Sequence, residues 1–166
     1  MRVFLSGFMA SGKSVVGCQL AAILNLPFHD LDEVVAGAAG MSITEIFAAD
    51  GEAGFRKREA AAVLELAGVP SAVVALGGGT VVSGANRRIL RRAGCLVWLN
   101  TPRSTILARL ADAAGDRPLL KNPEQAARLF EERFESYRDC DLELRPQPEE
   151  TAAEIASRIA ARPEVR

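Results

Sequence analysis

The chain has 166 residues, 49% of them hydrophobic, and its 20 basic and 21 acidic residues leave a formal net charge of −1. This size and composition predict one folded domain with a core of ordinary size. The balanced charge, without basic residues interleaved with aromatic ones, argues against nucleic-acid binding, and a single histidine excludes sites built from several. No signal peptide is recognisable and the apolar runs are too short to cross a bilayer, so we expect a cytoplasmic enzyme.

A phosphate-binding pattern follows the first apolar run. Residues 2–6 are expected to form a strand, and residues 7–14 after it read GFMASGKS, which has the G-x-x-x-x-G-K-S spacing. The glycines let successive backbone N–H groups point into one concavity, and a helix expected over 13–24 adds its positive N-terminal end. Lys13 supplies a charge to the outer phosphates, and Ser14 a hydroxyl ligand for Mg²⁺. This pattern predicts a nucleoside triphosphate site; the alternative is a glycine-rich turn without a ligand.

Two aspartates follow the second expected strand, over 27–30. Asp30 ends this strand and Asp32 lies in a brief helix expected to run to Gly37. Each has a purely structural alternative, since Asp30 can cap that helix and Asp32 can complement its dipole. A capping-box spacing at 42–45 then opens a helix that stops at 50–51, before another over 52–66.

Strands and helices alternate through the rest of the chain. An apolar run over 72–76 predicts a strand buried on both faces, and three consecutive glycines follow it. The remaining expected elements are a helix over 85–92, a strand over 96–99, a helix opened by residues 101–102, a loop over about 111–122, a helix over 122–139, a strand over 142–144 and a helix over 149–161. This order predicts one α/β domain with five parallel strands. The phosphate loop, the aspartates and the glycines all fall at carboxyl ends of strands, where such sheets bind ligands.

Six patterns, in this order, resemble shikimate kinase over nearly the whole chain. They are the phosphate loop, D-x-D at 30–32, D-G-E-x-x-F-R-x-x-E at 50–59, G-G-G at 77–79, R-P-L-L at 117–120 and R-x-x-x-Y at 133–137. The resemblance implies a single P-loop NTPase-type domain over 1–166, a three-layer sandwich similar to nucleoside monophosphate kinases. Its substrate-binding helices would lie at about 31–67 and a mobile lid at about 111–122. The implied activity is transfer of the γ-phosphoryl group of ATP to the 3-hydroxyl of shikimate, a step toward chorismate and the aromatic amino acids, by a cytoplasmic monomer with Mg²⁺.

The resemblance also implies roles for individual residues. The implied catalytic residues are Lys13, Asp32 and Arg117, the last arriving on the lid. The implied ATP contacts are Ala10, Ser11, Gly12, Lys13, Ser14, Val15 and Arg117. The implied substrate contacts are Asp32, Arg56, Gly77, Gly78, Gly79 and Arg133, with Arg56 and Arg133 on the carboxylate. The implied metal ligands are Ser14 and, through water, Asp30.

Other interpretations of the same residues remain open at this point. Arg56 has acidic neighbours at helical spacing and Arg133 lies among glutamates, so both fit salt-bridged helix surfaces. Phe47 and Phe55 fit either the core or a pocket wall. The resemblance is not perfect, because Ala10 stands where many members have glycine and residues 145–148 align loosely, so no adenine contact is assigned.

Competing functions on the same scaffold are a gluconate or nucleoside monophosphate kinase and a non-catalytic binding protein. A GTPase is less well supported, because no N-K-x-D-like base-reading motif occurs.

Overall fold

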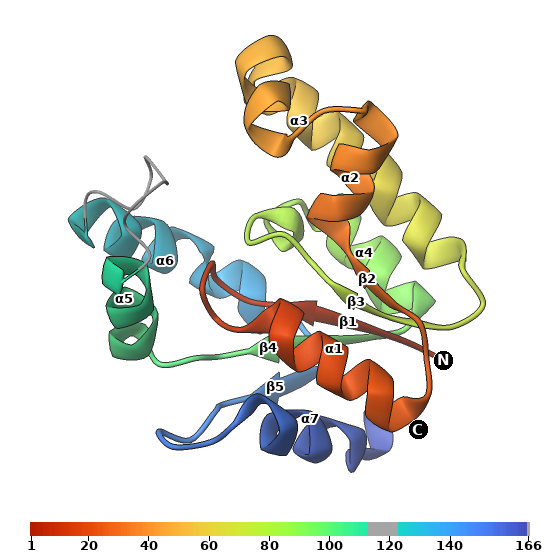
Figure 1. Ribbon diagram of the computed structural model, residues 1–166, viewed down its shortest axis with the longest axis vertical. Helices are drawn as coiled ribbons and strands as arrows, with labels where there is room; N and C mark the ends of the chain where they lie inside the picture. Colours follow the sequence, from red (N-terminus) through yellow and green to blue (C-terminus); the bar gives the residue numbers. More distant parts are fainter. Residues whose placement is uncertain (113–122, 166) are drawn as a thin grey trace.

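The computed structural model describes residues 1–112 and 123–165. Within these residues, five strands form one sheet in the order β2-β3-β1-β4-β5, and every neighbouring pair is parallel (Figure 1). The strands are β1 (Arg2–Ser6), β2 (Phe28–Asp30), β3 (Ala72–Ala75), β4 (Cys95–Leu99) and β5 (Leu142–Leu144). The predicted five-stranded parallel α/β fold is therefore confirmed.

Helices cover both faces of this sheet (Figure 1). They are α1 (Lys13–Leu24), α2 (Leu31–Ala39), α3 (Ile43–Gly68), α4 (Gly84–Ala93), α5 (Arg103–Asp112), α6 (Pro123–Arg138) and α7 (Ala152–Ala160), with 3₁₀ turns η1 (Thr80–Val82) and η3 (Pro163–Val165). Alternate residues of one strand enter different cores: Phe4 packs with the α2–α6 side, and Val3 and Leu5 with α1 and α7. This alternation is the period-2 geometry of a strand buried on both faces, and it produces three layers.

Three element boundaries refine the sequence expectations. α2 runs past Gly37 to Ala39 and ends at Gly40, which takes a left-handed conformation (φ 66°). The expected stop at residues 50–51 is a kink, because Gly51 has non-helical angles (φ 67°, ψ −172°) within α3. The last helix was expected from residue 149 but begins at Ala152, since Thr151 forms its capping box with Glu154.

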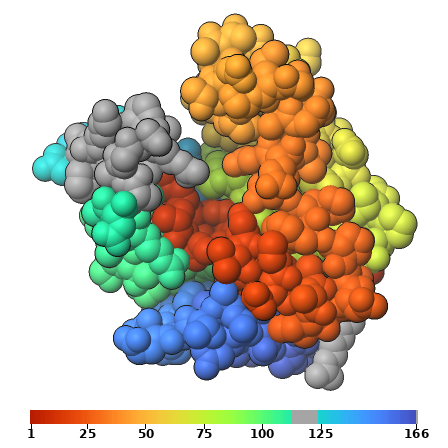
Figure 2. Space-filling model, in the orientation of Figure 1, coloured from red at the N-terminus to blue at the C-terminus, as the bar shows by residue number. Residues whose placement is uncertain are grey.

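The fold gathers the functional candidates at one edge of the sheet. In the register, Leu5 and Asp30 both lie beside Ala75, so β1, β2 and β3 end together. α2 and the first part of α3 rise from this edge, and the red phosphate-loop end of the chain is visible between them and α5 (Figure 2). No helix in the described ranges is long and apolar enough to span a membrane. Most of the expected lid, residues 113–122, lies outside the described residues.

Candidate active site

The phosphate loop takes a backbone shape that few sequences allow. Gly7 (φ 145°), Ala10 (φ 59°) and Gly12 (φ 97°) all have positive φ. Gly12 is the N-cap of α1 and provides no side-chain cap, so the first N–H groups of this helix are left for a ligand. A helix N-terminus of this kind favours anions, which supports the predicted phosphate site.

Two side chains from outside the loop hydrogen-bond to its backbone carbonyl groups. The Thr101 hydroxyl donates to the carbonyl oxygen of Ser11 at 2.9 Å, and Arg109 Nη1 donates to that of Ala10 at the same distance. The sequence assigned neither residue to the site, and it placed Thr101 only at the start of the next helix. Both come from the segment after β4, which is adjacent to β1 in the sheet.

The Lys13 side chain folds back onto the start of the phosphate loop. Its ammonium donates to the carbonyl oxygens of Gly7 and Phe8, each at 2.9 Å. Burial lowers the pKa of Lys13 to about 8, against the opposing effect of Asp32 and Asp30. The group is therefore a cation at neutral pH, poised where the outer phosphates of a nucleotide would lie.

Each carboxylate oxygen of Asp30 has its own partner, and one of these contacts is the helix cap that the sequence allowed. One carboxylate oxygen accepts the backbone N–H of Asp32 at 3.0 Å and caps α2, and the other accepts the Ser14 hydroxyl at 2.6 Å. A hydroxyl and a carboxylate oxygen beside a phosphate loop are hard oxygen ligands, which fit Mg²⁺.

Asp32 lies between the phosphate loop and the glycine turn (residues 77–79). Burial is the main cause that raises the pKa of its carboxyl above the ordinary value, and the charges of Asp30 and Glu59 add to it. Lys13 and Arg56 act in the opposite direction. A carboxylate in this setting is more basic than one in water, which suits proton acceptance.

Arg56 is held by a buried acid. Its Nη1 lies 2.8 Å from Glu59 Oε2, and the Glu59 residue is only 1% exposed. The other Glu59 oxygen accepts the buried Thr80 hydroxyl at 2.7 Å. The i,i+3 pair that the sequence allowed is therefore present, but the buried acid anchors the arginine and the pair is not an ordinary surface one.

Phe55 and Phe47 adjoin this arginine. Phe55 is 5% exposed and belongs to the core, whereas Phe47 is 40% exposed and stacks on it with 4.7 Å between ring centres. The Arg56 guanidinium carbon lies 5.2 Å from the centre of the Phe55 ring.

Each residue of the glycine turn lies against a different candidate side chain. A Cβ atom would lie 3.1 Å from Asp32 Oδ1 at Gly77, 3.7 Å from Arg133 Nη1 at Gly78 and 2.5 Å from Arg56 Nη2 at Gly79. At Gly78 it would also lie 3.3 Å from the backbone nitrogen of Met9. The turn is therefore not merely a flexible connection: it allows the phosphate loop, the aspartate and both arginines to approach closely.

Arg133 is not part of a salt-bridged helix surface. In the described part of the chain no ion pair involves it, and its neighbours Glu131 and Glu135 pair with Arg103 and Arg138. Arg133 instead lies near the hydroxyl of Tyr137, one turn later on α6, where it lowers the pKa of that phenol against the larger effect of burial. It is close enough to Lys13 to lower the pKa of that ammonium further.

The structure thus brings together most of the predicted site. Residues from distant segments meet at the sheet edge, namely Ser11, Gly12, Lys13, Ser14, Asp30, Asp32, Arg56, Gly77, Gly78, Gly79 and Arg133. Val15 is 61% exposed on α1 just beyond the loop. Arg117 lies outside the described residues. Glu59, Thr80 and Tyr137 were given no role from the sequence, although Glu59 and Tyr137 belong to the quoted patterns.

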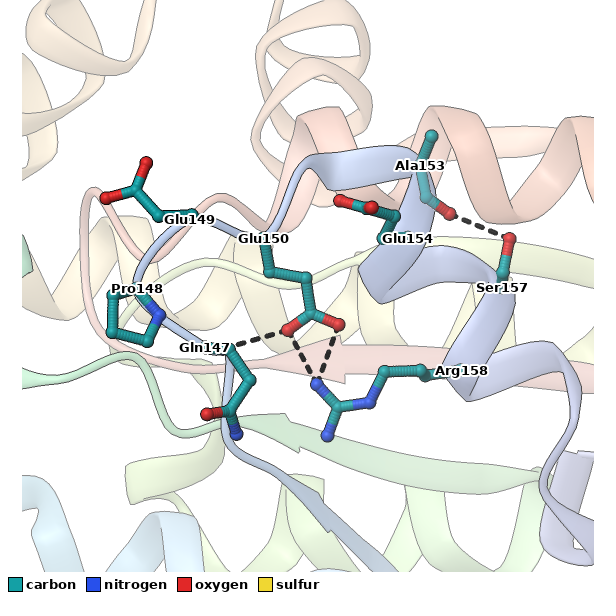
Figure 3. A pocket seen from close by; sticks show the side chains of 8 residues that line it. All are labelled: Gln147, Pro148, Glu149, Glu150, Ala153, Glu154, Ser157 and Arg158. Carbon is teal, nitrogen blue, oxygen red and sulfur yellow. Dashed lines mark hydrogen bonds and ion pairs between the residues drawn. The ribbon is translucent and has the colours of Figure 1, made fainter.

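A groove at the start of α7 is lined by none of these residues, and Figure 3 shows the side chains that do line it. It includes residues 147–150, which overlap the loosely aligned segment 145–148, and Arg158. Glu150 accepts the Gln147 backbone N–H at 2.8 Å and pairs with Arg158 at 2.6 Å. These contacts fix the turn that precedes α7.

Comparison with known proteins gives a consistent result. The family model described as shikimate kinase matches residues 9–163. A shikimate kinase of Aquifex aeolicus is 39% identical over 158 residues, which are 93% of this chain and 94% of that protein. The structure of shikimate kinase from Acinetobacter baumannii in complex with shikimate superposes with a TM-score of 0.87 at 32% identity, covering 95% of this chain and 89% of that one.

A gluconokinase from Sinorhizobium meliloti is more distant. Its TM-score is 0.58 at 21% identity, covering 94% of this chain and 87% of that one, and this likeness shows the fold alone.

Proposed function

The chain belongs to the shikimate kinase family of ATP-dependent kinases, and we propose that it transfers the γ-phosphoryl group of ATP to the 3-hydroxyl of shikimate with the residues described above. The observation that carries this assignment is the position of Asp32. It is electrostatically coupled to Lys13 of the phosphate loop on one side and to Arg56 on the other. A hydroxyl beside Asp32 would therefore meet a phosphoryl group held by the loop.

On the nucleotide side, the phosphate loop binds the phosphates of ATP through backbone N–H groups and the N-terminus of α1. Lys13 neutralises the charge that develops on the transferred group, which is how proteins mainly accelerate phosphoryl transfer. Its present acceptors are neutral carbonyl oxygens of the loop, so anionic phosphate oxygens compete favourably for the ammonium.

On the acceptor side, Arg56 and Arg133 bind the carboxylate of shikimate, since planar guanidinium groups suit bidentate contacts. The oxygen of the 3-hydroxyl attacks the γ-phosphorus, and Asp32 accepts the proton that this hydroxyl loses. The bond from that phosphorus to the β–γ bridging oxygen breaks, and ADP leaves. The raised pKa of Asp32 strengthens it as a proton acceptor.

Mg²⁺ belongs to this proposal through Ser14 and Asp30, whose oxygens face each other at 2.6 Å. The ion, when bound, would neutralise phosphate charge. Asp30→Asn should raise the Mg²⁺ concentration needed for half-maximal activity, and an unchanged Mg²⁺ titration would exclude Asp30 as a ligand. The catalytic role of Arg117, a lid over about 111–122, a cytoplasmic location and a monomeric state remain proposals from the sequence alone.

A coupled assay of ADP release tests the function. Shikimate, gluconate and AMP are offered side by side with ATP and Mg²⁺, and only shikimate should stimulate release. Stimulation by gluconate or AMP but not by shikimate would overturn the proposal.

A further inference from the structure

Tyr137 joins two parts of the proposed substrate site. It is 1% exposed, and its hydroxyl donates to the carbonyl oxygen of Gly78 at 2.5 Å, while Arg133 lies close enough to affect the pKa of the same hydroxyl. Its ring stacks on Trp98 with 6.1 Å between centres. One buried phenol therefore links the glycine turn to an arginine on α6.

The glycine turn needs an external anchor because it has no side chains of its own. The carbonyls of Gly77 and Gly79 accept N–H groups from Thr80 and Val82, at 3.2 and 3.1 Å. The Gly78 carbonyl lies between them and has Tyr137 as its partner. Glycine has more backbone freedom than any other residue, so this bond removes a rotation that the turn would otherwise keep.

The bond also orients a hydrogen-bond donor. A peptide unit is planar and trans, so with the Gly78 carbonyl directed at Tyr137 the N–H of Gly79 points the opposite way. Within residues 1–112 and 123–165, none of the hydrogen bonds uses the N–H of Gly78 or Gly79. Gly78 also lies close to the backbone of Met9, so the orientation of this peptide is defined relative to the phosphate loop.

We propose that Tyr137 is a positioning residue for shikimate binding, whose hydroxyl holds the Gly78–Gly79 peptide and the Arg133 guanidinium in one arrangement. The inference rests on the proposed function, in which Arg133 and the glycine turn contact shikimate. Burial raises the pKa of Tyr137 to about 12, so the phenol keeps its proton and donates at every pH at which the enzyme works. Tyr137 contacts no reacting atom in this account.

Tyr137→Phe tests the proposal because it keeps the ring on Trp98 and removes only the hydroxyl. We expect the KM for shikimate to rise about tenfold, the equivalent of one lost buried hydrogen bond, with kcat and the KM for ATP changed less than about twofold. Ile159→Val is the matched control. This substitution removes a buried methyl group and destabilises the core on the other face of the sheet, away from the proposed substrate site. The KM for shikimate should therefore not change.

A double mutant separates positioning from a general loss of structure. Because Tyr137 is proposed to hold Arg133 as well as the glycine turn, Tyr137→Phe should raise the KM less in an Arg133→Ala background, where only the effect through the turn is left, than in the wild type. An equal rise in both backgrounds, an unchanged KM, or a loss confined to kcat would overturn the proposal. If Arg133→Ala itself left the KM unchanged, the assignment of Arg133 in the proposed function would be wrong as well.

Discussion

The phosphate loop and the acceptor region (Asp32, Arg56, residues 77–79 and Arg133) are built in different ways. The loop is eight consecutive residues, 7–14, that follow β1 and extend into the first turn of α1, and most of the groups that it offers to a ligand are backbone N–H groups. The acceptor region takes side chains from α2, α3 and α6 and holds them through Glu59, Thr80 and Tyr137. A backbone site recognises phosphate in general, whereas a site of dispersed side chains provides selectivity for one acceptor.

This contrast predicts different failures. Damage to the loop should reduce the rate of transfer whatever the acceptor, because the loop holds the transferred group in the proposed function. Damage to the acceptor region should reduce shikimate binding, because this region contacts the carboxylate and the ring of shikimate in the proposed function. Asp32 lies between the loop and the rest of the acceptor region. Its substitution should reduce the rate of transfer, as damage to the loop does, more than it reduces shikimate binding.

Lys13→Ala should have the largest effect. Removing the one loop cation that reaches the transferred group should lower kcat by roughly a thousandfold. Steady-state kinetics measures this, with circular dichroism to verify folding and Lys57→Ala as a control for loss of an exposed lysine. Turnover within tenfold of the wild type would show that the loop does not contribute to catalysis in this way.

Asp32→Asn should follow, with a loss of kcat of about a hundredfold or more if the carboxylate takes the hydroxyl proton. The wild-type kcat/KM should also fall on the acid side as this carboxyl protonates. Because its pKa is raised, that fall begins at a higher pH than for an ordinary aspartate, and the variant should lack it. A variant in which only the KM for shikimate rises would assign Asp32 to the acceptor region.

The contrast also explains what the sequence predicted. The loop is a contiguous pattern at the end of an apolar strand, so sequence alone located it, and the aspartates and glycines followed from their places at strand ends. Arg56 and Arg133 needed the resemblance, because acidic neighbours at helical spacing made both look like surface residues. The structure gives these neighbours different partners: Glu59 is buried against Arg56, whereas Glu131 and Glu135, near Arg133, pair with other arginines.

The supporting residues were not predicted because their contacts join distant segments. Tyr137 is 59 residues from Gly78, and Arg109 is 99 residues from Ala10. One signal was present for Glu59. It shares the helical spacing of Phe55, Ala62 and Leu66, which are buried, so an acid on this apolar face indicates a buried ion pair.

Arg56→Ala and Arg133→Ala should separate the two arginines of the acceptor region. Each should weaken shikimate binding by about 1.5–3 kcal/mol, the range for hydrogen bonds to charged groups, with little change for ATP. Only Arg56→Ala should also lower the melting temperature markedly, because it leaves Glu59 buried without its cation. Titration calorimetry and thermal unfolding measure these effects, and similar melting temperatures for the two variants would contradict this account.

Raising the pH should impair the interaction of the phosphate loop with ATP at a lower pH than it impairs the binding of shikimate by the acceptor region. The Lys13 pKa is lowered to about 8, so the ammonium is protonated below this pH and loses its charge above it. We expect kcat/KM for ATP to fall about tenfold for each further pH unit, because this parameter reports the free enzyme. Bound phosphates favour the ammonium, so kcat itself should hold to higher pH. Profiles of kcat and kcat/KM that fall together would contradict this expectation.

Ala10→Gly should have the smallest effect, on stability, and it tests whether the loop is as self-contained as its sequence suggests. Ala10 is held in a left-handed conformation (φ 59°) while its carbonyl accepts Arg109. That conformation costs an L-residue about 1–2 kcal/mol, which glycine would avoid. The greater freedom of glycine in the unfolded chain offsets about 0.5–1 kcal/mol of this gain. The net gain of about 0.5–1 kcal/mol should raise the melting temperature by about 1–4 °C.

Ala108→Gly is the matched control for this substitution, because residue 108 is exposed in the interior of α5 and has ordinary helical geometry. There glycine should cost about 1 kcal/mol and lower the melting temperature. Opposite signs for the same chemical change would mean that contacts from outside the loop, such as that of Arg109, impose its shape at a cost in stability. Destabilisation by both substitutions would mean instead that the left-handed conformation of Ala10 carries no strain, and that the loop alone sets the geometry of the phosphate site.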